Sequence, residues 1–340
     1  MERVGRGRSL AWREFRSKLR TVWLVRWGRV SLKRPWREAV AAVERRGAQD
    51  AVFALERLGR HLVADAWGAA PPRRLFESPE VADLPPSSLI LLHAGVGLEF
   101  ADRVLGDLPR QPAAEPVRTA LHRFADLCRD NSLPGYLAAA FEPLGVVVRL
   151  LHGRLLPEIE RQIAVVEPEV ASYFWHGVGR AYYFLPRHLR PLRSTLAAAI
   201  AHCHAEPRQP TSRLDALQGL FFAATMVNLH HPPVVAALLA QAEAAGEGER
   251  FSSGLVACLL ARHDMTPADP ALHHLLDYLP PAASRVAALW EPRVAAPSRE
   301  ALRHFYPVLK QSQRLGLLAH RVSLPWVVDR LEHGQAVPDV

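Results

Sequence analysis

One pattern that occurs twice limits the folds open to this chain of 340 residues. Gly95-Val96-Gly97 and Gly177-Val178-Gly179 each lie within an apolar segment of helix length. Two further pairs of segments follow in the same order: Val117–Leu121 with Leu192–Leu196, and Leu133–Ala139 with Leu217–Ala223. Because the spacing is roughly 80 residues, longer than one helical hairpin, we predict a tandem duplication whose copies each hold several helices.

The two Gly-Val-Gly elements have two interpretations. Glycine inside a helix costs about 1 kcal/mol relative to alanine but allows another backbone to approach closely, so helix crossing is the simpler one. The other is that the four glycines border a groove and bind a ligand, and they are our candidate ligand-binding residues: Gly95, Gly97, Gly177 and Gly179. A dinucleotide-binding fingerprint is excluded, because Phe100 and Tyr182 stand where its third glycine belongs.

The rest of the chain predicts an all-α globular fold. Apolar residues recur at helical spacing, whereas alternation of period two is nearly absent. The segments that we expect are a basic N-terminal arm, N-terminal helices with a proline-rich connector, a duplicated core with copies at 88–153 and 172–245, and a C-terminal helical segment: 1–37, 38–87, 88–245 and 246–340.

Four local features accompany this division. Helices are expected at 35–46 and 50–70, and five prolines make 71–87 an exposed connector. Ser212 is a candidate cap for the helix that follows it. Beyond residue 246 we expect short helices that end at the prolines Pro267, Pro270, Pro280, Pro281, Pro292 and Pro297.

Charge is concentrated at the N-terminus. Residues 1–37 hold twelve of the 42 Lys and Arg residues and two of the 34 acidic ones, a net charge of +10, which leaves −2 for the remainder. Three cysteines imply no disulfide framework, and arginines interrupt every candidate for a signal peptide. No apolar run is long enough to span a bilayer. We therefore expect a cytoplasmic protein, peripheral to the inner face of the membrane if the arm binds lipid.

The arm itself reads as a basic amphipathic helix from Leu10 to Trp27. Its apolar positions recur at helical spacing and its cations take the other faces: Trp12, Phe15, Leu19, Val22 and Trp23 against Arg13, Arg16, Lys18 and Arg20. The aromatic stripe either packs on the body, with the arginines in solvent, or contacts an anionic membrane or a protein partner. Nucleic acid is the least favoured partner, because no nucleic-acid-binding motif accompanies the charge.

Candidate catalytic residues are confined to one segment. His176, Arg180 and Tyr183 are spaced to share one helical face, where Arg180 could bind an oxyanion and His176 could move a proton. The alternative is structural: His176 is satisfied in the core, and Arg180 pairs with Glu99, Asp102 or Asp215.

Other chemistry finds little support in the sequence. The imidazoles of His202-Cys203-His204 would point apart on a helix, so we predict no metal site. There is no GxSxG nucleophile elbow, since Ser252-Ser253-Gly254 lacks the leading glycine, and no P-loop. No cofactor is expected.

Two strings carry a family resemblance. Phe174-x-x-Gly177-Val178-Gly179-Arg180-x-x-Tyr183-Phe184 precedes Asp215-Ala216-Leu217-Gln218-Gly219-Leu220-x-x-Ala223, and Leu55-Glu56-x-x-Gly59 lies near the start. Together they resemble an uncharacterised bacterial family encoded in enediyne and related polyketide biosynthesis gene clusters. The resemblance implies an accessory role in natural-product or lipid-like metabolism.

The functional expectation follows from these points. We expect an accessory, non-catalytic protein that binds a hydrophobic small molecule or a biosynthetic partner. The alternative is an enzyme that acts on a polyketide- or isoprenoid-like substrate through His176, Arg180 and Tyr183.

Overall fold

The computed structural model describes residues 2–27, 35–319, 323–335 and 337, in which every regular element is helical and no strand occurs. The predicted all-α class is confirmed. The chain divides into two compact units: unit 1 comprises Met1–Val22 and Gly179–Asp339, and unit 2 comprises Trp23–Val178. Both boundaries fall inside helices, α1 (Glu2–Trp27) and α9 (Pro168–Tyr183). The second boundary lies within the predicted core at 88–245.

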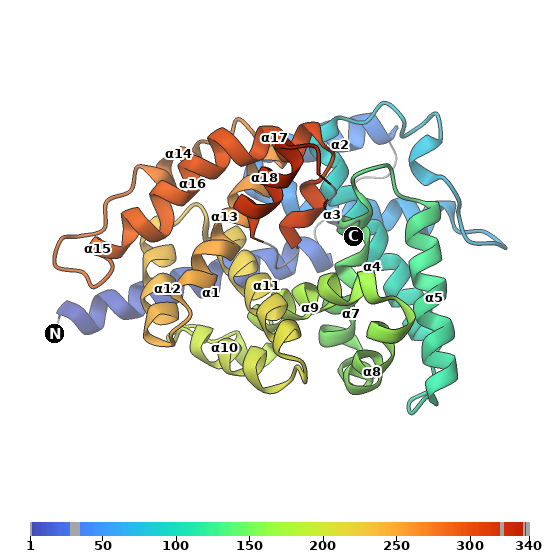
Figure 1. Ribbon diagram of the computed structural model, residues 1–340, viewed down its shortest axis with the longest axis horizontal. Helices are drawn as coiled ribbons and strands as arrows, with labels where there is room; N and C mark the ends of the chain where they lie inside the picture. The colour runs from blue at the N-terminus through green and yellow to red at the C-terminus, as the bar shows by residue number, and fades with distance from the viewer. Residues whose placement is uncertain (1, 28–34, 320–322, 336, 338–340) are drawn as a thin grey trace. The chain divides into compact units, whose positions relative to one another are not determined.

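Unit 2 is built from α-helices that range from 5 residues in α6 to 21 residues in α4 (Figure 1). Its elements before α9 are α2 (Trp36–Glu44), α3 (Ala48–Ala66), η1 (Leu75–Glu77), α4 (Pro86–Gly106), α5 (Ala114–Asp130), α6 (Leu137–Phe141), α7 (Pro143–Leu151), η2 (Gly153–Leu155) and α8 (Leu156–Val166). The predicted helices at 35–46 and 50–70 correspond to α2 and α3.

Glycine brings α3 and α4 into backbone contact. A Cβ atom on Gly95 would lie 1.9 Å from the carbonyl oxygen of Glu56 and 2.8 Å from the Cα of Gly59. The reverse holds as well, since a Cβ on Gly59 would lie 2.2 Å from the carbonyl oxygen of Leu92. Real Cβ atoms do not approach other atoms so closely, so this crossing requires glycine on both helices.

The same register recurs where α7 crosses α9. A Cβ on Gly177 would lie 2.1 Å from the carbonyl oxygen of Glu142, and one on Gly145 would lie 1.9 Å from that of Phe174. Glu142 precedes Gly145 by three residues, as Glu56 precedes Gly59. Gly95 and Gly177 therefore have closely similar surroundings in unit 2.

The second glycine of each Gly-Val-Gly element meets an alanine. A Cβ on Gly97 would lie 2.0 Å from the carbonyl oxygen of Ala140, and one on Gly179 would lie 1.9 Å from that of Ala216. All four glycines are therefore buried against neighbouring backbone, as the helix-crossing interpretation describes.

A third crossing, in unit 1, has the same spacing of contact residues, but a phenylalanine replaces one of the two glycines. A Cβ on Gly254 would lie 2.9 Å from the carbonyl oxygen of Gln218 and 2.8 Å from the Cβ of Phe221. Gln218 precedes Phe221 by three residues and follows Ala216 by two, just as Glu142 precedes Gly145 by three and follows Ala140 by two. Phe221 thus takes the place of the second glycine and holds these helices further apart.

The remaining predicted correspondences between the copies do not match locally. Gly135 lies in a turn with a φ of 83°, whereas Gly219 lies inside α11 (Pro210–Asn228). Val117–Leu121 is helical, but Leu192–Thr195 precedes a helix. The alignment of these segments is wrong, because glycine serves a left-handed turn in one case and helix packing in the other. The duplication itself stays a prediction.

The sequence predicts that the connector at 71–87 is exposed, and the structure contradicts this prediction. Five of its residues are buried: Pro72, Leu75, Phe76, Val81 and Leu84. The amide of Asn131 donates to the carbonyl oxygen of Pro72 at 2.9 Å and its oxygen accepts from the backbone N–H of Leu75 at 3.2 Å. Proline content indicated a loop correctly, but these bonds fold the loop onto the helices.

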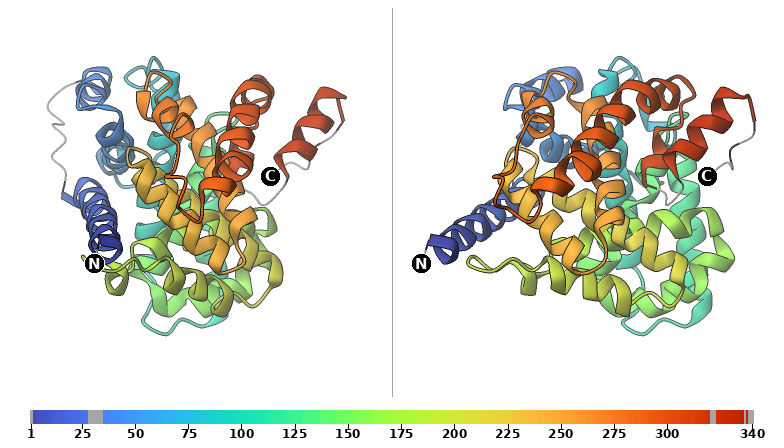
Figure 2. Two further views of the ribbon diagram at one scale, coloured as in Figure 1. Left: turned by 90° about the vertical axis from the view of Figure 1, so that its left-hand side faces the viewer. Right: turned by 60° about the vertical axis from the view of Figure 1, so that its left-hand side comes forward.

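Unit 1 contains α1 up to Val22 and the elements that follow α9; α1 is one continuous helix, dark blue in Figure 2. The elements after α9 are η3 (Pro186–His188), α10 (Leu196–Ala205), α11 (Pro210–Asn228), α12 (Pro232–Ala244), α13 (Gly248–Met265), α14 (Pro270–Leu276), α15 (Ala287–Trp290), η4 (Glu291–Ala295), α16 (Ala296–Glu300), η5 (Ala301–Phe305), α17 (Tyr306–Gln311), η6 (Leu315–Ala319) and α18 (Leu324–Glu332). Pro210 opens α11, so Ser212 lies inside that helix and does not cap it.

Residues 287–311 form one helix despite its internal prolines. Two turns widen to the π register, in which Ala296 donates to the carbonyl oxygen of Glu291 and Tyr306 to that of Ala301. The predicted breaks at Pro292 and Pro297 are therefore wrong, because π turns absorb the missing donors. The predicted end of helix at the other four prolines agrees with the structure, since each lies in a loop or opens a helix.

Candidate functional site

His176 is buried in the core of unit 2, where it pairs with Glu142. Its Nδ1 lies 3.1 Å from Oε1 of Glu142, and the side chains are only 2% and 5% exposed. Glu142 is also the residue whose carbonyl oxygen faces Gly177, so the crossing of α7 and α9 brings the pair together. The contact fits the structural interpretation of His176.

Tyr183 belongs to a buried polar cluster in unit 1. Its hydroxyl donates to Oε1 of Glu14 at 3.1 Å and accepts from the amide of Asn228 at 2.8 Å. Lys18 lies 3.8 Å from the centre of the Tyr183 ring and 2.8 Å from Glu14, and it donates to Thr195 at 3.3 Å. Burial raises the pKa of Tyr183 well above its ordinary value, and the charge of Glu14 raises it further. We call these residues the α1 anchor: Glu14, Lys18, Tyr183, Thr195 and Asn228.

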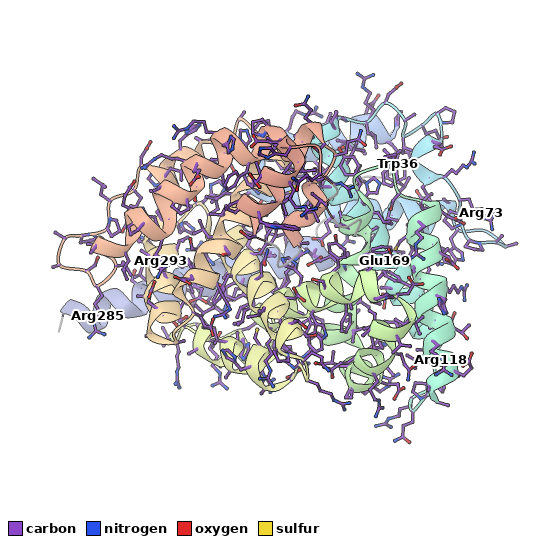
Figure 3. The ribbon with its side chains drawn as sticks, in the orientation of Figure 1. Trp36, Arg73, Arg118, Glu169, Arg285 and Arg293 are labelled. Atoms are coloured by element: carbon purple, nitrogen blue, oxygen red, sulfur yellow. The ribbon has the colours of Figure 1, made fainter. Side chains whose placement is uncertain are left out.

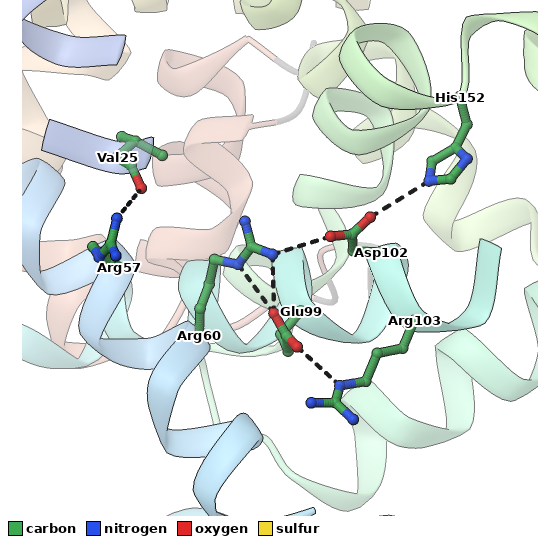
Figure 4. A network of polar contacts seen from close by, with 7 residues as sticks. All are labelled: Val25, Arg57, Arg60, Glu99, Asp102, Arg103 and His152. Carbon is green, nitrogen blue, oxygen red and sulfur yellow. Dashed lines mark hydrogen bonds and ion pairs between the residues drawn. The ribbon is translucent and has the colours of Figure 1, made fainter. Parts of the chain in front are cut away.

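The acids proposed as partners of Arg180 divide between the units. In unit 2, Arg60 binds both Glu99, at 3.0 Å, and Asp102, at 3.1 Å, from α3 across to α4 (Figure 4). Arg180 belongs to unit 1, where burial raises the pKa of the Cys258 thiol and the charges of Arg262 and Arg180 partly offset that rise. Neither of the two clefts described next is lined by His176, Arg180, Tyr183 or the four predicted glycines.

A cleft of about 460 Å³ opens in unit 1 between α11, α13, the helix at 287–311 and the start of α18. Its apolar lining comes from all four segments: Leu214, Val256, Pro297, Phe305, Leu324 and Pro325. The volume is within the range of small-molecule sites, about 300–1,000 Å³. We take this apolar cleft as the candidate site.

The polar groups of the apolar cleft are largely engaged by the protein. Ser252 donates to the carbonyl oxygen of Arg293 at 2.5 Å, which is the acceptor that Pro297 leaves without an intrahelical donor. Ser253 donates to the carbonyl oxygen of Glu249 at 3.1 Å, and Arg250 binds Glu247 at 2.8 Å. The hydroxyls of Ser252 and Ser253 therefore both donate to backbone carbonyl groups and are not placed as nucleophiles.

Ion pairs and a hydrogen bond between neighbouring helices hold the walls of the apolar cleft in place. Arg293, labelled in Figure 3, binds Glu243 of α12 and Glu249 of α13, both at 3.2 Å. Gln218 donates to the carbonyl oxygen of Leu318 at 3.2 Å, which ties α11 to η6. Its walls are thus held by contacts that do not need a ligand.

A second cleft, of about 420 Å³ in unit 2, has a different character. Its lining mixes charges of both signs from the connector and α5: Arg73, His122, Arg123, Asp126 and Asp130. Arg73, labelled in Figure 3, lies 3.5 Å from Asp130. The charges neutralise one another, so this cleft has no bias towards an anion or a cation.

Reactive groups are scarce among the described residues. All three cysteines are fully buried, and burial raises the pKa of each thiol above its ordinary value, against nucleophilic or ligand roles. His202 binds Glu206 and His204 binds Glu247, so the two imidazoles diverge. Within the described ranges, no three His, Cys, Asp or Glu side chains gather as metal ligands would.

His93 is a buried residue that the sequence did not single out. Its ring is stacked between Phe76, with ring centres 3.9 Å apart, and Tyr136, at 5.0 Å. Nδ1 lies 2.7 Å from the carbonyl oxygen of Leu89, and Nε2 accepts from the backbone N–H of Leu133 at 3.1 Å. Both contacts are made by one neutral tautomer, and burial lowers the pKa of His93 to about 4.

This shift predicts an acid sensitivity of unit 2. Between pH 6.5, the ordinary pKa of histidine, and about pH 4, the pKa of folded His93, this side chain is protonated in the unfolded chain but neutral in the folded one. The free energy of unfolding therefore decreases as the pH falls through that range. From about pH 7.5 to about pH 4.5 this group alone should remove about 2–3 kcal/mol of folding free energy. Urea unfolding of the wild type and of His93→Gln at both pH values measures the difference, and equal pH dependence in the two would contradict the assignment.

Neither a membrane-spanning helix nor a similar known protein is found for the described part of the chain. Within the described ranges no helix has the length and apolarity needed to traverse a bilayer. Comparison with protein-family models, with curated proteins and with solved structures finds no match to this chain.

Proposed function

We propose that the chain is a non-catalytic accessory protein that binds an elongated hydrophobic small molecule in the apolar cleft of unit 1. The observation that carries the proposal is a 460 Å³ space in which four helical segments place six apolar residues beside six polar ones. Such a site gains free energy by removing apolar surface from water and offers few directional bonds. Its ligand is selected mainly by shape and hydrophobicity.

The polar groups at the site support binding over chemistry. Ser252 and Ser253 donate to backbone carbonyl oxygens, and Arg250 binds Glu247 at the edge. The enzyme alternative depends on His176, Arg180 and Tyr183. No observation favours it, because His176 and Tyr183 are buried and held by Glu142 and Glu14.

The resemblance to proteins encoded in enediyne and related polyketide clusters fits this proposal. Polyketides are built largely from carbon chains and rings, which an apolar cleft would accept. We propose that the protein carries or shields such a molecule, and that it works beside the inner face of a membrane, where apolar molecules partition. A biosynthetic protein that inserts an apolar side chain is the other occupant that the site could take.

Titration with cis-parinaric acid, a fluorescent polyene fatty acid, tests the cleft. Leu214 and Leu324 are half-buried and face it from α11 and α18, so glutamine at both positions should leave the fold intact. Each substitution removes apolar contact worth about 1 kcal/mol, so the double variant Leu214→Gln/Leu324→Gln should bind roughly thirty-fold more weakly.

The matched control is Leu192→Gln, at a leucine of unit 1 that is 62% exposed and does not line the cleft. It should bind the probe as the wild type does. The proposal fails if the wild type shows no saturable binding, or if the double variant and the control bind equally well.

A further inference from the structure

Three residues of the apolar stripe of α1 are exposed on the outer face of the helix. Trp12, Leu19 and Trp23 are 44%, 42% and 53% exposed. At 100° per residue these three positions fall within about 40° of one another around the helix. They account for three of the nine large hydrophobic side chains that are exposed in the described parts of the chain.

The α1 anchor explains this orientation. The docked face of the helix carries Glu14 and Lys18, 3% and 2% exposed, with Ala11 and Thr21 beside them. Because the ion pair and its bonds to Tyr183 and Thr195 lie on that face, Trp12 and Leu19 cannot pack on unit 1 without breaking the anchor. The sequence offered packing of the stripe on the body as one interpretation, and the structure contradicts it for Trp12 and Leu19.

Cations line one side of the exposed stripe. Arg16, Arg20 and Arg13 follow it at about 40° to 100° around the helix, and all three are exposed. Burial, and then neighbouring cations with Arg13 first among them, lower the pKa of His231. An exposed tryptophan stripe beside a row of arginines matches the boundary between anionic headgroups and acyl chains.

We propose that this outer face of α1 binds an anionic lipid bilayer, with Trp12, Leu19 and Trp23 inserted and the arginines on the headgroups. A second copy of the chain is disfavoured, because two such faces would bring like-charged arginine rows together. Nucleic acid would use the arginines but leave the apolar stripe in water. The proposal does not rest on the ligand of the apolar cleft.

Vesicle sedimentation of the full chain tests this surface. We expect binding to vesicles of phosphatidylglycerol and phosphatidylcholine, weakened by salt, and little binding to phosphatidylcholine alone. Trp12→Ser/Trp23→Ser should bind more than about tenfold more weakly. Arg13→Gln/Arg16→Gln should lose about fivefold for each arginine removed and much of the salt dependence.

The control is Leu279→Ser, at a leucine that is 84% exposed outside α1, and it should bind like the wild type. Circular dichroism of every variant establishes that the helices are kept. The proposal is overturned if the wild type does not sediment with anionic vesicles, or if the tryptophan variant sediments as the wild type does. It is equally overturned if the wild type self-associates and the tryptophan variant does not, which would assign the face to a second copy.

Discussion

Replacing Gly95 by alanine is expected to destabilise unit 2 by more than about 3 kcal/mol, because its methyl group would lie 1.9 Å from the carbonyl oxygen of Glu56. The obstacle is backbone, which cannot rotate away, so α3 and α4 would have to separate along their length. Gly177→Ala meets the carbonyl oxygen of Glu142 at 2.1 Å and should cost a similar amount. Urea unfolding with hydrogen exchange resolved along the chain measures both effects.

Two other glycines provide the controls. Gly106 also belongs to α4 but has no atom within 4 Å of its Cβ position, so Gly106→Ala should be neutral or stabilise by up to about 1 kcal/mol. At Gly254 the first obstacle is the Cβ of Phe221 at 2.8 Å, and alanine should cost about 1–2 kcal/mol. If Gly95→Ala costs no more than Gly106→Ala, close backbone packing does not hold this crossing.

Replacing Lys18 by methionine should destabilise unit 1 by about 3–5 kcal/mol, because it leaves Glu14 buried without its cation. Glu14 would still accept from the hydroxyl of Tyr183 at 3.1 Å, but that group carries no charge. Protection of α1 from hydrogen exchange should fall together with the free energy of unfolding.

A double variant separates the ion pair from the packing of the helix. Glu14→Leu/Lys18→Met replaces both charges by apolar groups of similar size and should recover most of the loss. Arg16→Met removes an exposed cation from the same helix and should change stability by less than about 0.5 kcal/mol. An equal effect of Lys18→Met and Arg16→Met would show that α1 is not held by the anchor.

Helix content and several boundaries could be predicted because they depend on local pattern. A proline at the start of a predicted helix, as at Pro35 before α2, and apolar residues at helical spacing report on neighbours along the chain. Glycine inside an apolar helix likewise indicated close packing, and Gly95 and Gly177 are packed that way.

The orientation of α1 could not be predicted, because its determinants are distant in sequence. Its apolar stripe alone favours packing through Trp12 and Leu19. The helix docks through Glu14 and Lys18 because Tyr183 and Thr195, more than 150 residues away, bind them, and Asn228 in turn binds Tyr183. A buried ion pair on an otherwise basic helix has no signature that distinguishes it from a solvated one.

The candidate site was hidden from the sequence for a similar reason. Its lining runs from Leu214 to Pro325 in four segments, none of which carries a motif. The crossing at Gly254 was missed as well, because Phe221 stands where Gly59 and Gly145 stand in the other two. The shared register could be seen only once the contacting carbonyl groups of Glu56, Glu142 and Gln218 were known.

Mass spectrometry of organic extracts from the purified full chain tests the proposed function most directly. The wild type and the Leu192→Gln control should release one apolar species in about the amount of the protein, and Leu214→Gln/Leu324→Gln should release much less. An extract with no such species from the wild type, or with equal amounts from all three proteins, would contradict an apolar ligand in the cleft of unit 1.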